Sequence, residues 1–481
     1  MNDPGLGELT DYAVRVRRAL HKIPELSGEE YETSAFVRAK LEELGYRVRS
    51  VHTGLYADIE GTGGEPGTIA LRADFDGLPI PERTGLPFAS ECGRMHACGH
   101  DGHTAMLLAA AKRFAAVPPK RNVRLIFQFG EEGEGGAAKM IDGGALDGVT
   151  EIYAFHLCPE LEKGRFATNA ETLFAGVMEF NVVINGKSSH CALPEEGRDA
   201  IAAAARFITE SKPLAERKGG ALMHTGKISG GSARNVVADR AVLECSFRYN
   251  DKARLAEVKE ELAELLARLD GEFGTKSVTE VRSVYPPLVC DAACVAKMRA
   301  LVSAEHIGGR YTAEDFAFYL ERVPGCMCWL GVRDGVHVSP LHSDTFDFDE
   351  SVMAEGIKAF VALGDAPEGF HSSSTVQAAS NPPACSIAAS DPDAAAAYSV
   401  TTASPTPRTT ASKGAAGAGS STPRGAPTSM APSSASVTSR QVAAASEASA
   451  RRAQKYAWPL AVVGASGIRR HEEPSTAASG D

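Results

Sequence analysis

Segments with helical periodicity alternate with short apolar runs along the first part of the chain, and this order restricts the fold more than any other feature. Apolar positions at helical spacing predict helices over residues 10–20, 27–44 and 105–114. Apolar runs predict strands over 46–51, 56–60, 68–72 and 122–129. Because such helices pack on the faces of a sheet, the sequence predicts a layered α/β sandwich.

A different order of elements follows. The pattern predicts strands over 177–184, 222–228, 241–249 and 277–284, with helices over 198–211 and 252–269. This β-α-β-β-α-β order is that of the ferredoxin-like motif, which closes on itself and can be inserted into another domain. We therefore expect a discontinuous first domain over 1–174 and 287–365, interrupted by an inserted α+β domain over 175–286.

Residues 366–481 differ in composition from the rest of the chain. They are rich in Ala, Ser, Thr and Pro and contain few large apolar residues. Such a segment cannot bury enough apolar surface to offset its conformational entropy. The sequence therefore predicts a low-complexity, disordered tail without a catalytic role.

Charge and hydropathy exclude several classes of partner. The formal net charge is -11, which disfavours binding to nucleic acid. No run of about 18 apolar residues is present, so we expect no membrane span. The first residues lack the apolar core of a signal peptide, which predicts a cytoplasmic location.

The segment from Met95 to His103 concentrates metal-binding side chains. Three His, one Cys and one Asp lie within it, separated by Gly residues that let a loop fold tightly. Thiolate and imidazole are preferred ligands of divalent transition metals. The alternative is a solvated polar loop, but the density of ligands favours a metal site.

Carboxylates follow two of the predicted strands. Asp74 comes after a buried strand and could orient a metal-bound His, or simply cap a turn. Glu131 and Glu132 follow another strand, and adjacent like charges tend to take different roles. Since successive side chains of a strand point to opposite sides, one Glu could bind a metal while its neighbour faces a water molecule.

His156 and His342 are isolated in the sequence. His156 ends a short apolar run and His342 precedes an acidic segment. Either alone would ordinarily be a core or surface His. They are candidate metal ligands only if the fold brings them next to the other ligands.

Together these segments resemble the M20 metallopeptidase family, in particular its amidohydrolase branch, which includes hippurate hydrolases, N-acyl-amino-acid deacetylases and auxin-conjugate hydrolases. The resemblance covers about residues 9–365. It rests on the motifs RADFDGLPI, GRMHACGHDGH, FGEEGEGG, AFHLCP, GKSSHCALPEEGRDAI, GGSARNVVADRAVLECSFR, AEDFAFYLERVPG and LHSDTFDFDE.

The resemblance implies two divalent cations per subunit, Mn²⁺ or Zn²⁺, with Co²⁺ or Ni²⁺ as substitutes. Their ligands would be Cys98, His100, Glu132, His156 and His342. Cys98 stands where other branches have a bridging Asp, and Arg72 where they have a metal-binding His. Glu131 would be the general base.

The resemblance also implies a substrate and a lid. His190 of the inserted domain would polarise the scissile carbonyl, and Asn235 and Arg248 would contact the substrate. The substrate would be an N-acyl amino acid or short peptide, cleaved to a carboxylic acid and an amino acid. The domain over 175–286 would act as a lid with hinges near Ala175 and Pro286, and would carry a homodimer contact.

Departures from the family pattern and two other functions stay open. Ala313 replaces the usual Gly, and Cys191 follows the lid His where a small residue is common. Cys98 could instead be the nucleophile of a thiol hydrolase, although the other ligands would then be unexplained. The chain could also be a metal-binding relative without turnover, which the presence of both Glu131 and Glu132 disfavours.

Overall fold

The computed structural model describes residues 4–64, 67–133 and 135–367. An eight-stranded sheet carries the order β1-β2-β4-β3-β5-β14-β6-β13. Its four middle strands, β4, β3, β5 and β14, run parallel. The strands are β1 (Val48–Val51), β2 (Gly54–Ile59), β3 (Thr68–Asp74), β4 (Asn122–Gln128), β5 (Val149–Glu162), β6 (Phe166–Thr168), β13 (Glu305–His306) and β14 (Gly325–Arg333).

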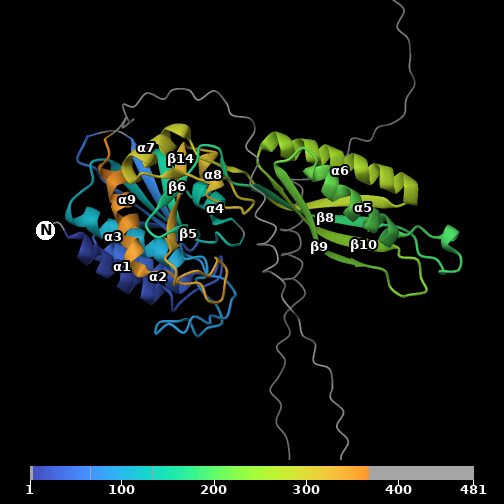
Figure 1. Ribbon diagram of the computed structural model, residues 1–481, viewed down its shortest axis with the longest axis horizontal. Coiled ribbons are helices and arrows are strands. Elements are labelled where there is room, and N and C mark those ends of the chain that lie inside the picture. The colour runs from blue at the N-terminus through green and yellow to red at the C-terminus, as the bar shows by residue number, and fades with distance from the viewer. Residues whose placement is uncertain (1–3, 65–66, 134, 368–481) are drawn as a thin grey trace, which may run out of the picture. The chain divides into compact units, whose positions relative to one another are not determined.

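Helices cover both faces of this sheet, as a layered α/β fold requires. On one side α1, α3 and α9 pack against one another, with α2 beside them, and α4 and α8 lie on the other side (Figure 1). The helices are α1 (Leu6–Leu20), α2 (Tyr31–Glu43), α3 (His100–Ala116), α4 (Gly136–Asp142), α7 (Ala292–Val302), α8 (Ala317–Leu320) and α9 (Met353–Asp365), with a 3₁₀ turn at Glu350–Val352.

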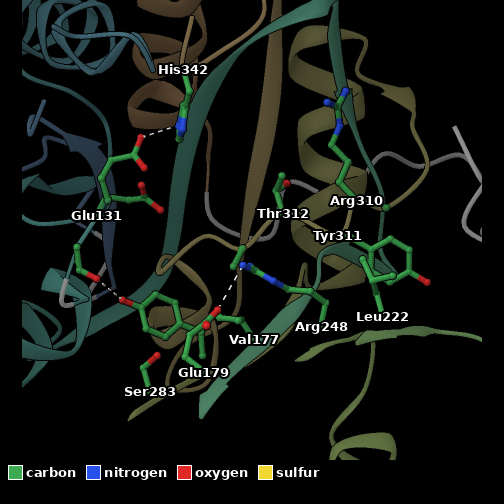
Figure 2. A pocket seen from close by; sticks show the side chains of 15 residues that line it. Glu131, Val177, Glu179, Leu222, Arg248, Ser283, Arg310, Tyr311, Thr312 and His342 are labelled. Atoms are coloured by element: carbon green, nitrogen blue, oxygen red, sulfur yellow. Dashed lines mark hydrogen bonds and ion pairs between the residues drawn. The ribbon is translucent and has the colours of Figure 1, made fainter. Parts of the chain in front are cut away.

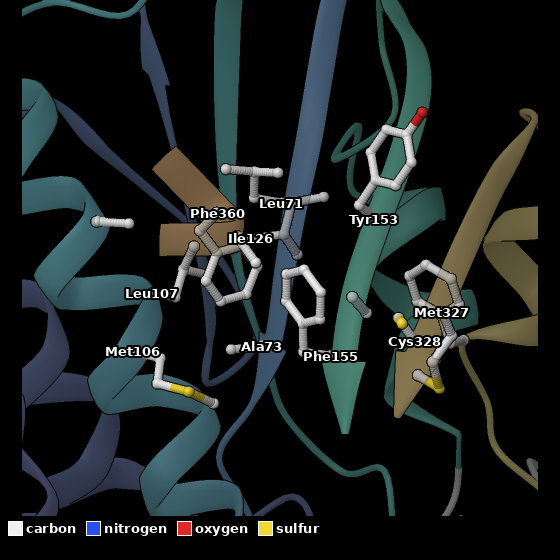
Figure 3. Close-up of a cluster of buried hydrophobic side chains, with 14 of the residues drawn as sticks. Leu71, Ala73, Met106, Leu107, Ile126, Tyr153, Phe155, Met327, Cys328 and Phe360 are labelled. Carbon is white, nitrogen blue, oxygen red and sulfur yellow. The ribbon is translucent and has the colours of Figure 1, made fainter. Parts of the chain in front are cut away.

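The core lies between the sheet and the layer of α1, α3 and α9. Figure 3 shows Leu107 of α3 and Phe360 of α9 facing side chains of the middle strands. The rings of Phe155 and Phe360 meet edge to face with centroids 4.7 Å apart. Burial of a side chain of this size contributes roughly 1.5–3 kcal/mol. This packing fixes the strand ends that carry the functional side chains.

A second, four-stranded sheet forms within residues 176–285. It has the order β11-β8-β10-β9. Its elements are β8 (Gly176–Asn185), a 3₁₀ turn (Pro194–Glu196), α5 (Ala200–Glu216), β9 (Ala221–Gly230), β10 (Arg240–Tyr249), α6 (Lys252–Phe273) and β11 (Lys276–Tyr285). The β-α-β-β-α-β sequence of elements is as predicted. Asp199 and Asp251 cap the two helices with their side chains.

The chain enters and leaves this second sheet at one place. β7 (Thr172–Phe174) directly precedes it, β12 (Leu288–Val289) directly follows it, and the two strands pair antiparallel. The pairing ties the two connecting segments together.

The second helix begins later than its predicted start at residue 27. α2 begins at Tyr31, and the side chain of its N-cap residue, Glu30, makes no capping hydrogen bond. The Ser27 hydroxyl donates to Asp76, and the Glu30 carboxylate accepts hydrogen bonds from Gly28, Gly130 and Thr53. The side chains of Ser27 and Glu30 therefore hydrogen-bond to groups outside the helix and do not begin it.

Two other predicted boundaries also shift. α3 begins at His100 rather than Ala105, because the loop before it turns through Gly99 at φ +85°. β5 continues past His156 to Glu162, so this His lies inside a strand and not at its end. Residues 368–481 of the predicted tail, which was expected to span 366–481, lie outside the described residues. Among the residues that the structure describes, no helix is long and apolar enough to cross a membrane.

Candidate metal centre

The predicted site residues lie in or after the parallel strands, toward the carboxyl-terminal ends of these strands. His156 lies within β5, Glu131 and Glu132 occupy a turn shortly after β4, and His100 is the first residue of α3. Parallel strands bring such segments to one edge of a sheet, where α/β proteins commonly place their sites.

Cys98 is shared by two groups of ligand atoms. The ligand atoms of Cys98, His100 and His156 lie within 4.8 Å of one another, and so do those of Cys98, Glu132 and His342. The Cys98 side chain is buried, and its Sγ lies 3.5 Å from His156 Nε2. A thiolate in both groups can bridge two cations.

His103 differs from His156 and His100 in that partners from the protein engage both of its ring nitrogens. His103 uses both nitrogens, since Nδ1 lies 2.6 Å from Asp74 Oδ1 and Nε2 accepts from the Leu157 N–H at 3.0 Å. His156 places Nδ1 2.8 Å from the Leu157 carbonyl oxygen, which leaves Nε2 toward Cys98. His100 Nε2 is buried and has no hydrogen-bond partner among the described residues.

His342 is held in a strained conformation beside Glu132. Its φ is +63°, a region that side chains other than Gly rarely adopt. Its backbone N–H donates to the Ala97 carbonyl at 2.9 Å, and its Nε2 lies 2.9 Å from Glu132 Oε1. Strain of this kind collects at functional sites, where the surroundings enforce it.

Glu131 and Glu132 do not alternate along a strand. β4 ends at Gln128, and both residues lie in a turn. One carboxylate oxygen of each lies within 4.8 Å of the other and of a His100 nitrogen. The predicted division between two faces is therefore wrong, because the alternation rule applies only to an extended strand.

The pKa directions reflect the burial of several carboxylates close together at the site. Burial, Glu314 and Glu132 raise the pKa of Glu131 well above its usual range. Burial and the carboxylates of Glu132 and Glu131 raise the pKa of the Cys98 thiol well above its usual range. Burial opposes protonation of His100, but Asp74 and Asp76 raise its pKa to about 10. A buried cluster of thiol, imidazole and carboxylate groups has the donor types that bind divalent metals.

Asp74 is part of a buried ion network next to the centre. Arg72 donates to Asp74 at 2.6 Å and to Glu314 and Asp315 at 3.1 Å. Asp74 also lies 2.6 Å from His103, whereas its distance to His100 Nε2 is 3.7 Å. It thus hydrogen-bonds a His outside the predicted ligand set. Arg72 supplies no ligand and instead balances three carboxylates.

A cavity of about 1020 Å³ opens beside Glu131, Glu132 and His342. Arg248 lines it, as does Arg310, and Figure 2 shows Glu131 and His342 on one side of the cavity and Arg310 on the other. Arg248 donates to Glu179 at 3.5 Å. The further lining residues are Gly133, Val177, Glu179, Leu222, Ser283, Tyr285, Gly309, Tyr311, Thr312 and Ala313.

His190 and Asn235 lie close to each other. Among the described residues, neither belongs to the set that lines this cavity. Both are exposed. The Cys191 N–H donates to the Asn235 carbonyl at 3.0 Å, and His190 pairs with Val236. The structure thus brings the metal ligands, Glu131 and Arg248 to one place, while His190 and Asn235 form a separate pair.

Sequence reasoning missed Arg310 and Asp76. Arg310 lies over the Trp329 ring at 4.8 Å and pairs with Glu160 at 3.1 Å, and its partners are distant in sequence. Asp76 stands two residues after Asp74 within the motif RADFDGLPI. Its buried carboxylate contacts His100 and Glu132. A second Asp at the same strand end was the available indication.

A family model described as peptidase family M20/M25/M40 matches residues 70–365. The chain belongs to this family. An N-acetyl-L-cysteine deacetylase from Bacillus subtilis (strain 168) is 39% identical over 370 residues, which cover 73% of this chain and 87% of that protein. An N-acetyldiaminopimelate deacetylase from Lactococcus lactis subsp. cremoris (strain SK11) is 33% identical over 364 residues, covering 72% of this chain and 96% of that protein. The predicted M20 amidohydrolase resemblance is confirmed.

Two solved structures share the fold. A Bacillus subtilis protein described as a dinuclear metal binding peptidase from the M20 family matches with a TM-score of 0.65 and 31% identity, covering 74% of this chain and 97% of that one. An aminohydrolase from methicillin-resistant Staphylococcus aureus matches with a TM-score of 0.71 and 29% identity, covering 74% and 96%. The predicted α/β fold agrees with both structures, and the predicted divalent metals agree with the dinuclear metal binding M20 peptidase and with the ligand groups of this chain.

Proposed function

We propose that this M20 protein hydrolyses the amide bond of N-acyl amino acids, releasing a carboxylic acid and a free amino acid. The observation that carries this proposal is the position of Cys98 in two ligand groups next to Glu131. The deacetylase relatives act on N-acetylated amino acids according to their names, and this supports the same substrate class.

We assign two divalent cations to Cys98, His100, Glu132, His156 and His342. The donor set of one thiolate, three imidazoles and one carboxylate favours Mn²⁺ or Zn²⁺, with Co²⁺ or Ni²⁺ as substitutes. Divalent cations held there would supply Lewis-acid activation of water and of the substrate carbonyl.

Glu131 is the general base in this proposal. Its carboxylate lies in the same ligand cluster but is not needed as a donor. It would take a proton from the attacking water and deliver it to the nitrogen of the leaving amine as the C–N bond breaks. Burial and the neighbouring carboxylates of Glu314 and Glu132 raise the pKa of Glu131, which suits a group that must hold and then release a proton.

The cavity wall opposite Glu131 suits a carboxylate. Arg310 presents a guanidinium that the Trp329 ring and Glu160 hold in place, and Arg248 lies on the same wall. Guanidinium groups bind carboxylates with paired hydrogen bonds. We propose that these two Arg residues bind the carboxylate of the substrate's amino acid.

We further propose that residues 175–286 form a lid on a catalytic domain made of 1–174 and 287–365. The separate second sheet and the paired strands β7 and β12 support hinges near Ala175 and Pro286. A role for His190 at the scissile carbonyl and for Asn235 at the substrate requires this segment to change position. These roles, the homodimer contact and the cytoplasmic location remain predictions.

The thiol-hydrolase alternative has one observation in its favour and one against it. Cys98 Sγ does lie 3.5 Å from His156 Nε2. However, burial and the adjacent carboxylates raise the thiol pKa, which is the reverse of what a nucleophilic Cys needs. The metal-dependent reaction is therefore favoured.

The proposal is tested by assaying the metal-loaded protein against N-acetyl and N-benzoyl amino acids, with the free amino acid detected directly. Release of amino acid from these compounds, and none from the matching amino acid amides that lack a carboxylate, is the expected result. A protein that binds two cations yet hydrolyses none of the panel would refute the proposed function.

A further inference from the structure

One buried aromatic ring contacts both a proposed metal ligand and an arginine of the cavity wall. Trp329 belongs to β14 and is 2% exposed. Its strand runs parallel to β5, where His156 is its register partner. Register partners of neighbouring strands project their side chains to the same face of a sheet, so the indole ring of Trp329 meets the imidazole ring of His156.

Three side chains pack against the Trp329 ring. The His156 ring meets it nearly edge to face, with centroids 5.2 Å apart and planes at 68°. The central carbon of the Arg310 guanidinium lies 4.8 Å from the centroid of the ring. The Phe174 ring packs at 4.8 Å with its plane tilted by 33°. A metal ligand and a cavity-lining cation therefore share one ring.

Arg310 is fixed at its backbone and at its guanidinium group. Its N–H donates to the Leu173 carbonyl at 3.1 Å, and its carbonyl accepts from the Ala175 N–H at 2.8 Å. Its Nη1 lies 3.1 Å from Glu160 Oε1, but the Glu160 side chain is 55% exposed, and an exposed ion pair contributes little. We therefore expect the buried Trp329 ring to determine where the guanidinium lies on the cavity wall (Figure 2).

Hydrogen bonding does not explain an indole at this position. Trp329 Nε1 is buried and has no hydrogen-bond partner among the described residues. Because a buried donor without a partner costs free energy, the contribution of Trp329 comes from its ring. The π electrons of an indole attract a cation over its face, and aromatic pairs gain from edge-to-face contact.

We propose that Trp329 is a positioning residue whose ring holds the metal ligand His156 and the carboxylate-binding Arg310 in a fixed relation to each other. The inference rests on the proposed function, in which cations act at the amide and Arg310 binds the substrate carboxylate. Trp329 is not among the described residues that line the cavity, so it acts through these two side chains. It sets the spacing between amide and carboxylate that the site accepts.

Trp329→Leu tests this role because it keeps an apolar side chain and removes the ring. N-benzoylglycine and N-benzoyl-β-alanine differ by one methylene between amide and carboxylate, so the ratio of their kcat/KM values reports the spacing that the site accepts. We expect the preference for N-benzoylglycine to fall about 3- to 30-fold, because Arg310 loses the ring that holds it. The Co²⁺ affinity of metal-free protein should fall about 3- to 10-fold, because His156 loses its edge-to-face partner.

Two further variants provide the comparison. Trp329→Phe keeps an aromatic ring and loses the unpaired N–H, so both quantities should lie closer to the unchanged protein than to Trp329→Leu. Phe155→Leu is the matched control, since Phe155 precedes His156 in β5 but its ring packs on Phe360 at the opposite face of the sheet. This control should lose stability in thermal unfolding and keep both the kcat/KM ratio and the Co²⁺ affinity.

A change in only one of the two quantities in Trp329→Leu would overturn the proposal, because the ring would then hold only one of the two groups. No change in either would overturn it as well. Equal effects of Trp329→Leu and Phe155→Leu would show that any loss of a buried ring acts in the same way. Equal effects of Trp329→Leu and Trp329→Phe would show that the ring contacts are not what matters.

Fluorescence covers the case in which Trp329→Leu fails to fold. The chain has two Trp residues, so Trp458→Phe leaves Trp329 as the only Trp emitter. Its emission in metal-free protein should change when Co²⁺ is added and, separately, when N-benzoylglycine is added, and a response to only one of them or to neither contradicts the proposal. The Co²⁺ measurements do not depend on hydrolysis. Unchanged protein that binds two cations and cleaves neither benzoyl compound refutes the proposed function, whereas intact hydrolysis that is equal in all variants refutes the role of Trp329 alone.

Discussion

The adjacent residues Glu131 and Glu132 are expected to fail in different ways when mutated. Glu131→Gln keeps the size of the side chain but removes the base, so both cations should stay bound while the rate falls by about 10²- to 10⁴-fold. Glu132→Gln removes a ligand and should lower metal affinity, with partial rescue of the rate by added metal. Metal content and turnover of both variants decide the assignment. Metal loss in Glu131→Gln with full metal content in Glu132→Gln would exchange the two roles.

Cys98 is expected to behave as a ligand. Cys98→Asp should retain part of the activity, since a carboxylate can also bridge two cations, whereas Cys98→Ala should lower metal occupancy. Mass spectrometry of the protein quenched during turnover should find no acyl group on Cys98. A trapped thioester at this position would contradict the assignment and favour the thiol hydrolase.

The residues of the metal centre could be predicted from the sequence where several metal-binding side chains lie close together along the chain. The three His and one Cys between Met95 and His103 mark a metal site by type alone. Which His is available depends on the Leu157 N–H and on Asp76, and both belong to other segments. No local pattern contains this information, which is why Asp74 was predicted to orient a ligand and Asp76 was missed.

At the scale of elements, a buried His connects α1 to α3. His21 Nδ1 lies 2.8 Å from Asp101 Oδ2. Burial opposes its protonation, but Asp101 and Glu82 raise its pKa to about 9. The unfolded chain has a His pKa near 6.5, so protonated His21 stabilises the fold fully below that pH, and this stabilisation is lost as the pH rises through about 9.

His21→Gln should therefore destabilise the protein more at pH 6 than at pH 10, by up to about 3 kcal/mol. Urea unfolding at both pH values measures the difference. His224→Gln, a change at an exposed His of β9, serves as the control and should show the same small effect at both. An equal effect of His21→Gln at the two pH values would show that the ion pair contributes nothing to stability.

Helices and strands could be predicted where apolar residues recur at regular spacing over the whole element. The α/β order and the β-α-β-β-α-β segment follow from apolar spacing alone. The start of α2 could not be predicted, because Ser27 and Glu30 hydrogen-bond to Asp76 and Gly130 instead of capping the helix. The side chains of Glu131 and Glu132 were expected to alternate as they do in a strand, because the apolar pattern does not reveal the turn at Gly130, whose φ is +64°.

At the scale of the whole molecule, the family match ends at residue 365 and α9 ends at Asp365. The Arg121 N–H donates to the Gly364 carbonyl at 2.9 Å, so the last turn of α9 belongs to the core. A chain that ends at Pro367 should fold, bind metal and turn over like the full chain. Comparison of the two chains by thermal unfolding and kcat/KM tests this, and insoluble expression of the shorter chain would contradict it.

The central claim is that hydrolysis depends on divalent cations held by Cys98 and its four companion ligands. The most direct measurement is the rate of N-acyl amino acid hydrolysis as a function of the metal bound per subunit, starting from chelator-treated protein and adding Mn²⁺ or Zn²⁺. We predict no measurable hydrolysis without metal and a rate that rises until two cations are bound. Full activity of protein shown by elemental analysis to contain no metal would contradict the account.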